Sequence, residues 1–331
     1  MKKVIIDLYG ADKGPEELLR GAVQAAESNP SLNFVLVGDE ASARAFLEKE
    51  GVSAPSFEFI QTTDYISNHE PAMAIFKGRD ECSTAKALDA LKADDEAIGL
   101  LGAGNTGALM VGSIFRLGLN GGLKSPALST MLPNVKGGMT TLVDCGANVN
   151  IDAVNLVDFA RLGSEFVRRM FDIKAPRVAL LNVGREEGKG SPLYAEAYGL
   201  LKTAGENGEI NFIGNAEGYD IITGYADVVV CDGFAGNIVL KLTEAVGKTA
   251  LSLVEAKMQT GETTSAAPAN GASEEQTALH EISENLKDLF VFNERGGATF
   301  LGTKKPVIKM HGCATADTVV ACTEQLLKVS R

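Results

Sequence analysis

The sequence alternates almost from end to end between short β-rich apolar runs and helical stretches. The β-rich runs are Val4–Leu8, Asn33–Val37, Phe57–Gln61, Ala97–Leu101, Ala127–Leu132, Thr140–Val143, Val178–Val183, Asn211–Ile213, Val228–Cys231 and Val307–Met310. The helical stretches include Glu16–Ser28, Ser83–Lys92, Val154–Phe171, Leu193–Ala204 and Asn237–Lys257. This alternation predicts an α/β fold with a doubly wound, mostly parallel sheet and helices on both faces, a Rossmann-like α/β/α sandwich. Ligands of such sheets bind at the carboxyl ends of the strands.

The length of 331 residues is enough to bury a large core, and we expect one α/β domain over residues 1–331. The segment Gln259–Ser273 is small, polar and free of aromatic residues, which predicts a flexible linker. It separates two long helices, the second at roughly Glu274–Leu289, in a helical extension around residues 240–290. The start of the chain, Met1–Asp7, is typical of a first strand and not of a signal peptide.

The charge and the reactive residues limit the class of partner. A net charge of −12 argues against non-specific binding to nucleic acid, and an acidic partner would need a local basic patch. The five cysteines form no CxxC pair, which is typical of reduced thiols in a cytoplasmic protein. None of the three histidines has metal-ligand spacing, so we expect no metal site.

A glycine-rich turn, Leu101-Gly-Ala-Gly-Asn-Thr-Gly-Ala-Leu-Met110, follows one apolar strand and precedes a helix. Free backbone N–H groups at such a turn, together with the positive end of the helix dipole, favour binding of an anion. Gly104, Asn105 and Thr106 are therefore candidate phosphate ligands. The alternative is that the glycines serve only tight packing.

Two further polar clusters end predicted strands. In Asp7–Pro15, glycines turn the chain toward a helix, and Asp12 could orient a lysine or simply cap that helix. In Val143–Val149, Asp144 and Asn148 flank Gly146, and an Asx-turn is the alternative explanation.

Two later segments carry side chains suited to chemistry. Leu181–Pro192 places Arg185 and Lys189 in a glycine-rich loop before a helix, although Lys189 could be a solvated loop lysine. Val228–Ile238 ends a buried strand and opens a helix near Asn237. A lysine and an amide that face one crevice could hold a phosphate and polarise a carbonyl.

The sequence contains no GxSxG motif, no Cys–His spacing and no HExxH motif. Any chemistry would then be direct displacement, with the anion itself as nucleophile. There is no Walker-type motif, and Gly102–Gly107 imitates the dinucleotide fingerprint only with shifted spacing. ATP hydrolysis and dinucleotide binding are therefore disfavoured.

Several motifs together closely resemble the PlsX-type phosphate acyltransferases of bacterial phospholipid synthesis, from about Val4 to Leu327. The motifs are Gly102–Met110, Asp144–Asn148, Pro176–Gly184, Lys189-Gly190, Ile210–Gly218, Asp232–Asn237, Gly296-Gly297 and Val307–Gly312. The resemblance implies conversion of acyl-(acyl carrier protein) and inorganic phosphate to acyl phosphate and free carrier protein. It also implies a homodimer without metal or nucleotide cofactor.

The resemblance assigns the catalytic lysine and asparagine to Lys189 and Asn237. We expect Lys189 to neutralise charge on the phosphate or the tetrahedral intermediate, and Asn237 to donate a hydrogen bond. The candidate phosphate- and substrate-binding residues are Asp12, Gly104, Asn105, Thr106, Asp144, Asn148, Asp232 and His311.

The chain departs from the family pattern at several positions. Gly10-Ala-Asp-Lys13 differs from the usual first turn, Gly78–Ser83 has lost the family's basic character, and His311–Thr315 replaces a His-Gly-Ser-Ser-Asp motif. Many relatives carry an apolar, basic helical hairpin where this chain has the polar linker followed by acidic residues. We therefore expect weak or absent membrane association.

Acyl carrier proteins are acidic, so docking would need a basic surface. The candidate clusters are Arg168, Arg169, Lys174 and Arg177, or Lys304, Lys305 and Lys309. Three other functions stay open at this point: a phosphotransacetylase-like enzyme that uses acyl-CoA, a catalytically weakened paralogue that acts as a scaffold, and a nicotinamide-dependent dehydrogenase.

Overall fold

The computed structural model describes residues 1–52, 57–260, 274–290 and 296–330. Its strands form one eleven-stranded sheet in the order β3-β2-β1-β4-β11-β10-β5-β6-β9-β7-β8. The strands are β1 (Lys3–Asp7), β2 (Asn33–Gly38), β3 (Glu58–Gln61), β4 (Ala97–Gly102), β5 (Ala127–Pro133), β6 (Met139–Val143), β7 (Arg177–Leu181), β8 (Asn211–Ala216), β9 (Val228–Val230), β10 (Ala298–Leu301) and β11 (Val307–Lys309).

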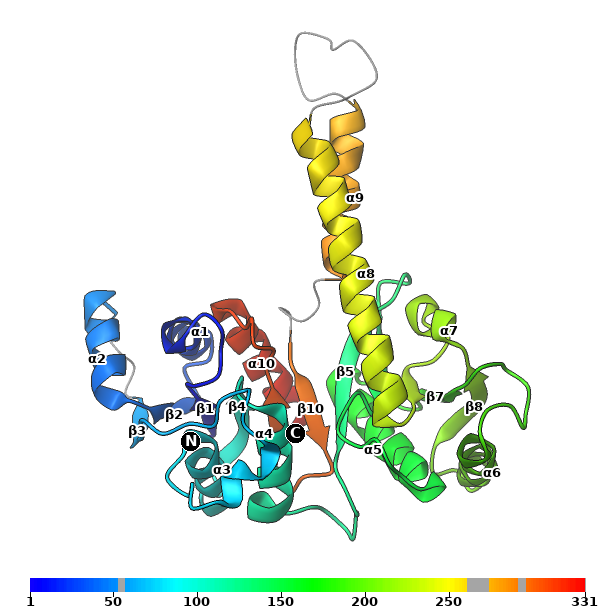
Figure 1. Ribbon diagram of the computed structural model, residues 1–331, viewed down its shortest axis with the longest axis horizontal. Helices are drawn as coiled ribbons and strands as arrows, with labels where there is room; N and C mark the ends of the chain where they lie inside the picture. Colours follow the sequence, from blue (N-terminus) through cyan, green and yellow to red (C-terminus); the bar gives the residue numbers. More distant parts are fainter. Residues whose placement is uncertain (53–56, 261–273, 291–295, 331) are drawn as a thin grey trace.

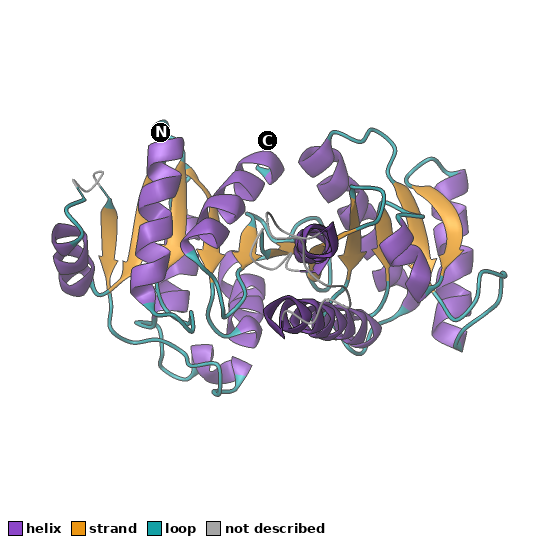
Figure 2. Cartoon of the chain, turned by 90° about the horizontal axis from the view of Figure 1, so that it is seen from above, coloured by secondary structure: helices purple, strands orange, loops and turns teal. Residues whose placement is uncertain are grey.

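Helices cover both faces of this sheet, as Figure 2 shows from above. They are α1 (Pro15–Ser28), α2 (Glu40–Lys49), α3 (Ser83–Ala93), α4 (Thr106–Gly112), α5 (Ala153–Phe171), α6 (Pro192–Glu206), α7 (Gly218–Thr223), α8 (Gly233–Thr260), α9 (Glu274–Phe290) and α10 (Ala316–Val329). Two short helical segments, η1 (Ala72–Phe76) and η2 (Ser113–Leu117), flank α4. The predicted α/β class, with helices on both faces of the sheet, is confirmed.

The sheet is mostly parallel, as predicted, but its centre is not. Seven of the ten described strand pairings are parallel and three are antiparallel. The three antiparallel pairings are β11–β10, β10–β5 and β5–β6, so β10 and β5 join two parallel halves that run in opposite directions. Strand β10 was missing from the predicted strands.

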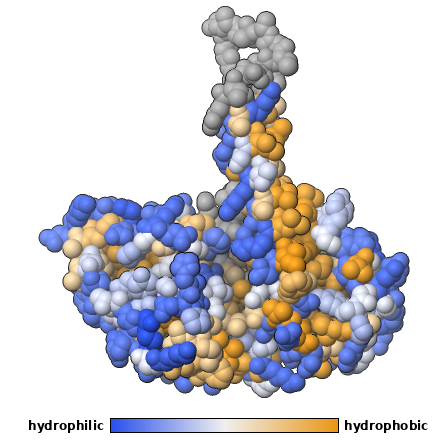
Figure 3. Space-filling view, viewed as in Figure 1, coloured by the Kyte–Doolittle hydropathy of each residue, from blue (hydrophilic) through white to orange (hydrophobic). Residues whose placement is uncertain are grey.

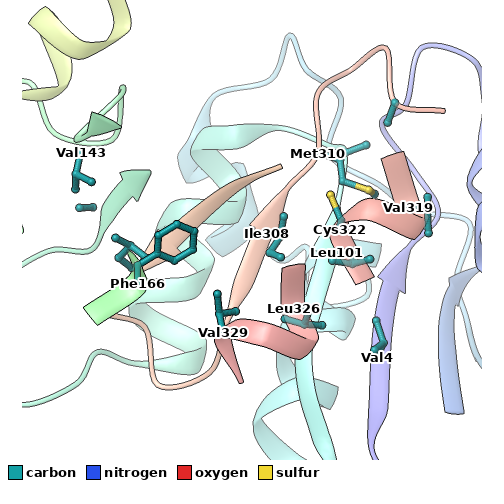
Figure 4. Close-up of a cluster of buried hydrophobic side chains, with 14 of the residues drawn as sticks. Val4, Leu101, Val143, Phe166, Ile308, Met310, Val319, Cys322, Leu326 and Val329 are labelled. Atoms are coloured by element: carbon teal, nitrogen blue, oxygen red, sulfur yellow. The ribbon is translucent and has the colours of Figure 1, made fainter. Parts of the chain in front are cut away.

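Side chains of the parallel strands enter apolar layers on both faces, because successive residues of a strand point to opposite sides. Val4 and Ile6 lie in one buried cluster and Ile5 in the other. Figure 4 shows Leu101 and Ile308 beside Cys322 and Leu326, which are on α10. Near-continuous apolar runs in the sequence therefore correspond to strands covered on both sides.

Helices α8 and α9 lie side by side and project from the body (Figure 1). The two helices approach closely at Gly247, where a Cβ atom would lie 2.1 Å from Cβ of Phe290. The predicted linker at 259–273 falls mainly on residues 261–273, which lie outside the described residues. Among the described residues, no helix has the length and apolar character needed to cross a membrane.

Candidate active site

The turn after β6 is organised by the buried carboxylate of Asp144. This carboxylate accepts hydrogen bonds from the backbone N–H groups of Gly146 and Ala147, both at 3.0 Å, and from the N–H of Asn148 at 2.7 Å. The amide of Asn148 donates to Asp144 and to the carbonyl oxygen of Pro126. Burial raises the pKa of Asp144. The geometry is that of the Asx-turn alternative, in which both side chains hold the loop.

The first turn of α8 packs directly on this loop through two glycines. A Cβ atom at Gly236 would lie 1.9 Å from the carbonyl oxygen of Asp144, and one at Gly233 would lie 2.7 Å from that of Asn148. The N–H of Gly233 also donates to the Asn148 carbonyl at 2.7 Å. The two family motifs Asp144–Asn148 and Asp232–Asn237 therefore form one packed unit, because glycine allows the backbones to touch.

Asp232 begins α8. Its carboxylate accepts from the N–H of Ala235 at 2.8 Å and from the hydroxyl of Tyr194, near the start of α6, at 2.6 Å. Burial and this hydrogen bond raise the pKa of Tyr194 far above its ordinary value, so the phenol keeps its proton. Asp232 thus caps one helix and ties it to another.

The glycine-rich turn after β4 packs against the turn after β1. A Cβ atom at Gly10, where φ is +92°, would lie 2.2 Å from Cα of Gly104. The Asn105 side chain accepts from the N–H of Ala108 and donates to the carbonyl oxygens of Ser67 and Glu70. Asn105 therefore caps α4 and holds the neighbouring segment, while Thr106 is exposed.

The loop after β7 carries Lys189 and Arg185. The Asn182 amide donates to the carbonyl oxygen of Lys189 at 3.0 Å, which holds the loop against β7. The Lys189 ammonium is half-exposed and lies 3.9 Å from a carboxylate oxygen of Glu186. Arg185 pairs with buried Asp220 and lies over the ring of Tyr225, so its charge stabilises the fold locally.

A cavity of about 350 Å³ lies between α8 and the antiparallel centre of the sheet. One face of α8 and three residues of β5 line it, as do the segments that follow β4, β6 and β11. These residues include Thr106, Gly107, Leu128, Thr130, Cys145, Gly146, Ala147, Asn237, Leu240, Lys241, Glu244, Lys309 and His311. Such a cavity falls within the volume range of small-molecule sites.

One side of the cavity is polar and contains a neutral histidine and a lysine. The N–H of Cys313 donates to His311 Nδ1 at 3.2 Å, so Nδ1 is an acceptor and the ring proton lies on Nε2. The Sγ atom of Cys313 is 3.0 Å from the same nitrogen, a Cys–His contact that the sequence analysis did not anticipate. Burial lowers the pKa of His311 and also lowers that of Lys309, to about 8.

The apolar part of the lining is rich in methionine. It is formed by Met110, Met131, Met139 and Met310, with Leu128 and Leu240. Methionine is unbranched and adaptable, so such a wall suits a flexible hydrocarbon chain.

Comparisons with known proteins show the family of this chain. A family model described as "Fatty acid synthesis protein" matches residues 2–329. The chain is 36% identical over 323 residues to the phosphate acyltransferase of Thermoanaerobacterium thermosaccharolyticum, covering 98% of this chain and 91% of that protein. It is 34% identical to the Clostridioides difficile phosphate acyltransferase, with 99% and 93% covered.

The chain belongs to the PlsX-type phosphate acyltransferase family. The family resemblance predicted from the motifs is thereby confirmed. The fold is also that of a phosphotransacetylase from Streptococcus pyogenes, with a TM-score of 0.64, 16% identity and coverage of 99% and 93% of the two chains.

Within this PlsX-type fold, the predicted site residues occupy three kinds of position. Thr106, Asn237 and His311 line the cavity, whereas Lys189 is not among the described residues that line it. The predicted residues Asn105, Asp144, Asn148 and Asp232 hold turns and helix starts through the hydrogen bonds described above. Gly104 allows the close approach to Gly10, and Asp12 is exposed, with its N–H bonded to the carbonyl oxygen of Gly312 at 2.7 Å.

Two features of the cavity were not predicted as site features. Lys309 had been grouped with Lys304 and Lys305 as a surface cluster, but it lines the cavity. Its place in the apolar run Val307–Met310 was a signal of a buried lysine. No sequence pattern indicated that Met110, Met131, Met139 and Met310 line one cavity, because they come from separate segments of the chain.

The altered segment Gly78–Ser83 has a structural use in this chain. The Arg79 guanidinium bonds to Asp64 at 2.6 Å and to Glu70 at 2.9 Å. The positive charge that this PlsX-type chain retains there is paired with carboxylates of its own fold.

Proposed function

We propose that this protein transfers the acyl group of an acyl-(acyl carrier protein) to inorganic phosphate. A phosphate oxygen attacks the thioester carbonyl carbon, the new C–O bond forms, the C–S bond breaks, and the carrier leaves as thiolate and takes up a proton. The observation that carries this proposal is the cavity, whose lining combines cations and neutral donors with methionine and leucine side chains. Membership of the phosphate acyltransferase family supports it.

The polar side suits the two reacting groups. Asn237 has an amide N–H₂ group, and His311 is neutral with its proton on Nε2, so both can donate to oxygen. Donors aimed at a carbonyl oxygen stabilise the charge that develops there when phosphate attacks. We assign that role to Asn237.

The apolar side suits the acyl chain. Met110, Met131, Met139 and Met310 can adapt to a flexible chain without leaving polar atoms unpaired. The carbonyl carbon would then lie at the boundary between the two sides, beside Asn237.

Lys189 is proposed to neutralise charge on the phosphate or the tetrahedral intermediate. Its loop precedes α6, and Tyr194 at the start of α6 bonds to Asp232 at the start of α8. The loop that carries Lys189 is thereby tied to the helix that carries Asn237. The pairing with Glu186 at 3.9 Å is exposed and weak, so it leaves the ammonium accessible.

We also infer a homodimer in which a second copy covers α8. Its apolar residues Ile238, Leu242, Val246 and Leu253 are 50–68% exposed and form a stripe along the projecting helix (Figure 3). A membrane-surface helix needs an excess of basic residues beside its apolar face. Helix α8 exposes Lys241, Lys248 and Lys257, but α9, which packs against it, exposes Glu281 and Glu284. A second copy is therefore the better occupant, and we expect weak or absent lipid binding and a cytoplasmic location.

The assembly is tested by mass and by lipid binding. The protein should sediment as a dimer, and Leu242→Glu with Val246→Glu should give monomers. Strong, salt-sensitive co-sedimentation of the wild type with liposomes would instead place the stripe on a membrane.

The donor is tested by comparing palmitoyl-carrier protein with palmitoyl-CoA at equal concentration in the presence of phosphate. We expect efficient turnover of the carrier-bound donor and much weaker turnover of the CoA thioester. The reverse preference would assign a phosphotransacylase of CoA thioesters, and turnover of neither donor by folded dimer would indicate a non-catalytic relative.

A further inference from the structure

Lys309 ends strand β11, two residues before His311 at the cavity. Its neighbours Val307, Ile308 and Met310 are all fully buried. Lys309 itself is partly buried and contributes to the cavity wall, together with Asn237 and His311. The charge of this lysine therefore lies at the wall of the cavity.

The hydrogen bonds of the Lys309 ammonium go to backbone carbonyls and not to a carboxylate. The Nζ atom donates to the carbonyl oxygen of Ala103 at 2.8 Å and to that of Met310. Both acceptors are neutral, and no ion pair within 4.0 Å joins Lys309 to a carboxylate among the residues that the structure describes. An ammonium has three N–H groups, so one is left for a ligand. A partly buried cation of this kind is stabilised by an anion.

We propose that Lys309 binds the phosphate co-substrate, with its third N–H donating to a phosphate oxygen that does not attack the thioester. This inference rests on the proposed function, because phosphate is the anion that the proposed reaction brings to the cavity. Lys309 transfers no proton in this scheme. It holds phosphate on the polar side, where another phosphate oxygen can reach a carbonyl beside Asn237.

The carbonyl partners also connect this lysine to the glycine-rich turn. Ala103 lies in the turn Gly102–Gly107, and the N–H of Met310 donates to the carbonyl oxygen of Gly102 at 2.9 Å. The glycine-rich turn therefore contributes to the site in two ways. Thr106 and Gly107 line the cavity, and the carbonyl oxygen of Ala103 holds the Lys309 ammonium in place.

The charge on Lys309 should depend on pH within the working range. Burial lowers the pKa of Lys309 to about 8, Asp12, Cys313 and Cys322 act in the opposite direction, and Lys241 lowers it further. The other ionisable groups on the cavity are Cys145, Glu244 and His311. Loss of the proton above about pH 8 removes the charge, so binding of phosphate should weaken as the pH rises from 7.5 to 9.

The test compares Lys309→Met and Lys309→Arg with Lys49→Met, which removes an exposed lysine of α2 outside the cavity. The readouts are the KM for phosphate at saturating acyl-carrier protein and the dissociation constant of inorganic phosphate, measured by calorimetry without acyl donor. Lys309→Met should raise both by at least about tenfold and leave the KM for the donor unchanged. Lys49→Met should behave as wild type.

Lys309→Arg separates a binding role from a structural one, because arginine keeps its charge. The wild-type KM for phosphate should rise between pH 7.5 and 9, and that rise should be absent in Lys309→Arg. The proposal is overturned if Lys309→Met binds phosphate as tightly as wild type. It is also overturned if the KM for phosphate of Lys309→Arg still rises between pH 7.5 and 9. This second measurement tests the proposal even if Lys309→Met does not fold. Absence of acyl transfer by wild type would refute the proposed function, while calorimetry would still decide whether Lys309 binds phosphate.

Discussion

The side-chain amide of Asn237 lies directly over Gly146, because a Cβ atom at position 146 would be 3.0 Å from Asn237 Nδ2. Gly146 has a φ of +142°, a conformation that favours glycine. The turn after β6 therefore provides the space in which the Asn237 side chain lies at the cavity.

Gly146→Ala should displace Asn237 and lower kcat by about tenfold or more, since a donor out of position no longer stabilises the developing charge. The matched control is Gly51→Ala, which also has a positive φ but has open space at the added methyl. Steady-state kinetics with both variants checks this. Equal, small effects in the two variants would show that backbone strain alone, and not the contact with Asn237, matters.

Asn237→Ala and Lys189→Ala should each reduce turnover, Asn237→Ala by about 10²–10³-fold, because each removes a group assigned to the charge of the transition state. Lys202→Ala is the control for Lys189, because Lys202 is also half-exposed and paired with a glutamate. Wild-type turnover in both folded variants would remove Asn237 and Lys189 from the mechanism.

Gly236→Ala should destabilise the protein by about 1–3 kcal/mol, because the added methyl meets the Asp144 carbonyl oxygen and forces α8 away from the loop. Gly199→Ala lies in α6 with open space around the methyl, and should instead stabilise by about 0.5–1 kcal/mol. Urea unfolding of both variants measures the difference. A neutral Gly236→Ala would mean that the helix and the loop are not in close contact.

The free energy of unfolding should depend on pH because of the buried carboxyl group of Asp7. Burial raises the pKa of this carboxyl from 3.8 to about 6, although Thr84 and the N–H of Tyr9 donate to it. Between these values the folded state binds more protons than the unfolded state, so this contribution to stability is lost as the pH rises from about 4 to about 6. Asp7→Asn removes the titration.

The stability of Asp7→Asn relative to wild type should therefore grow by about 2–3 kcal/mol between pH 4 and pH 6 and stay constant above it. Urea unfolding of both proteins over this range provides the measurement. Parallel pH profiles would show that Asp7 titrates at its ordinary pKa.

The outer parts of the sheet could be predicted because each parallel strand is an apolar run bounded by turn residues. The centre could not, because apolar content does not show strand direction, and β10 (Ala298–Leu301) pairs with both neighbours in the antiparallel sense. The strand is also only 4 residues long. The reversal at β10 and β5 depends on tertiary pairing, which a local pattern does not contain.

The turns of the candidate site could be predicted because glycine, Asn and Asp at the ends of strands are typical of tight turns and helix starts. Their roles were harder to predict, since Asp144 as a loop carboxylate and Asp144 as a ligand require the same residue type. Lys309 was predicted to lie on the surface because it is charged. Its neighbours in β11, Val307 and Ile308, are fully buried, and they indicated that this part of the chain lies in the interior.

The central claim is that phosphate itself attacks the thioester in this cavity. The most direct measurement is release of free thiol from palmitoyl-carrier protein with and without added phosphate, combined with hydroxylamine trapping of the product. The account predicts no release without phosphate, and phosphate-dependent release matched by trapped acyl hydroxamate. Release at the same rate without phosphate, or no release in either case from folded protein, would contradict it.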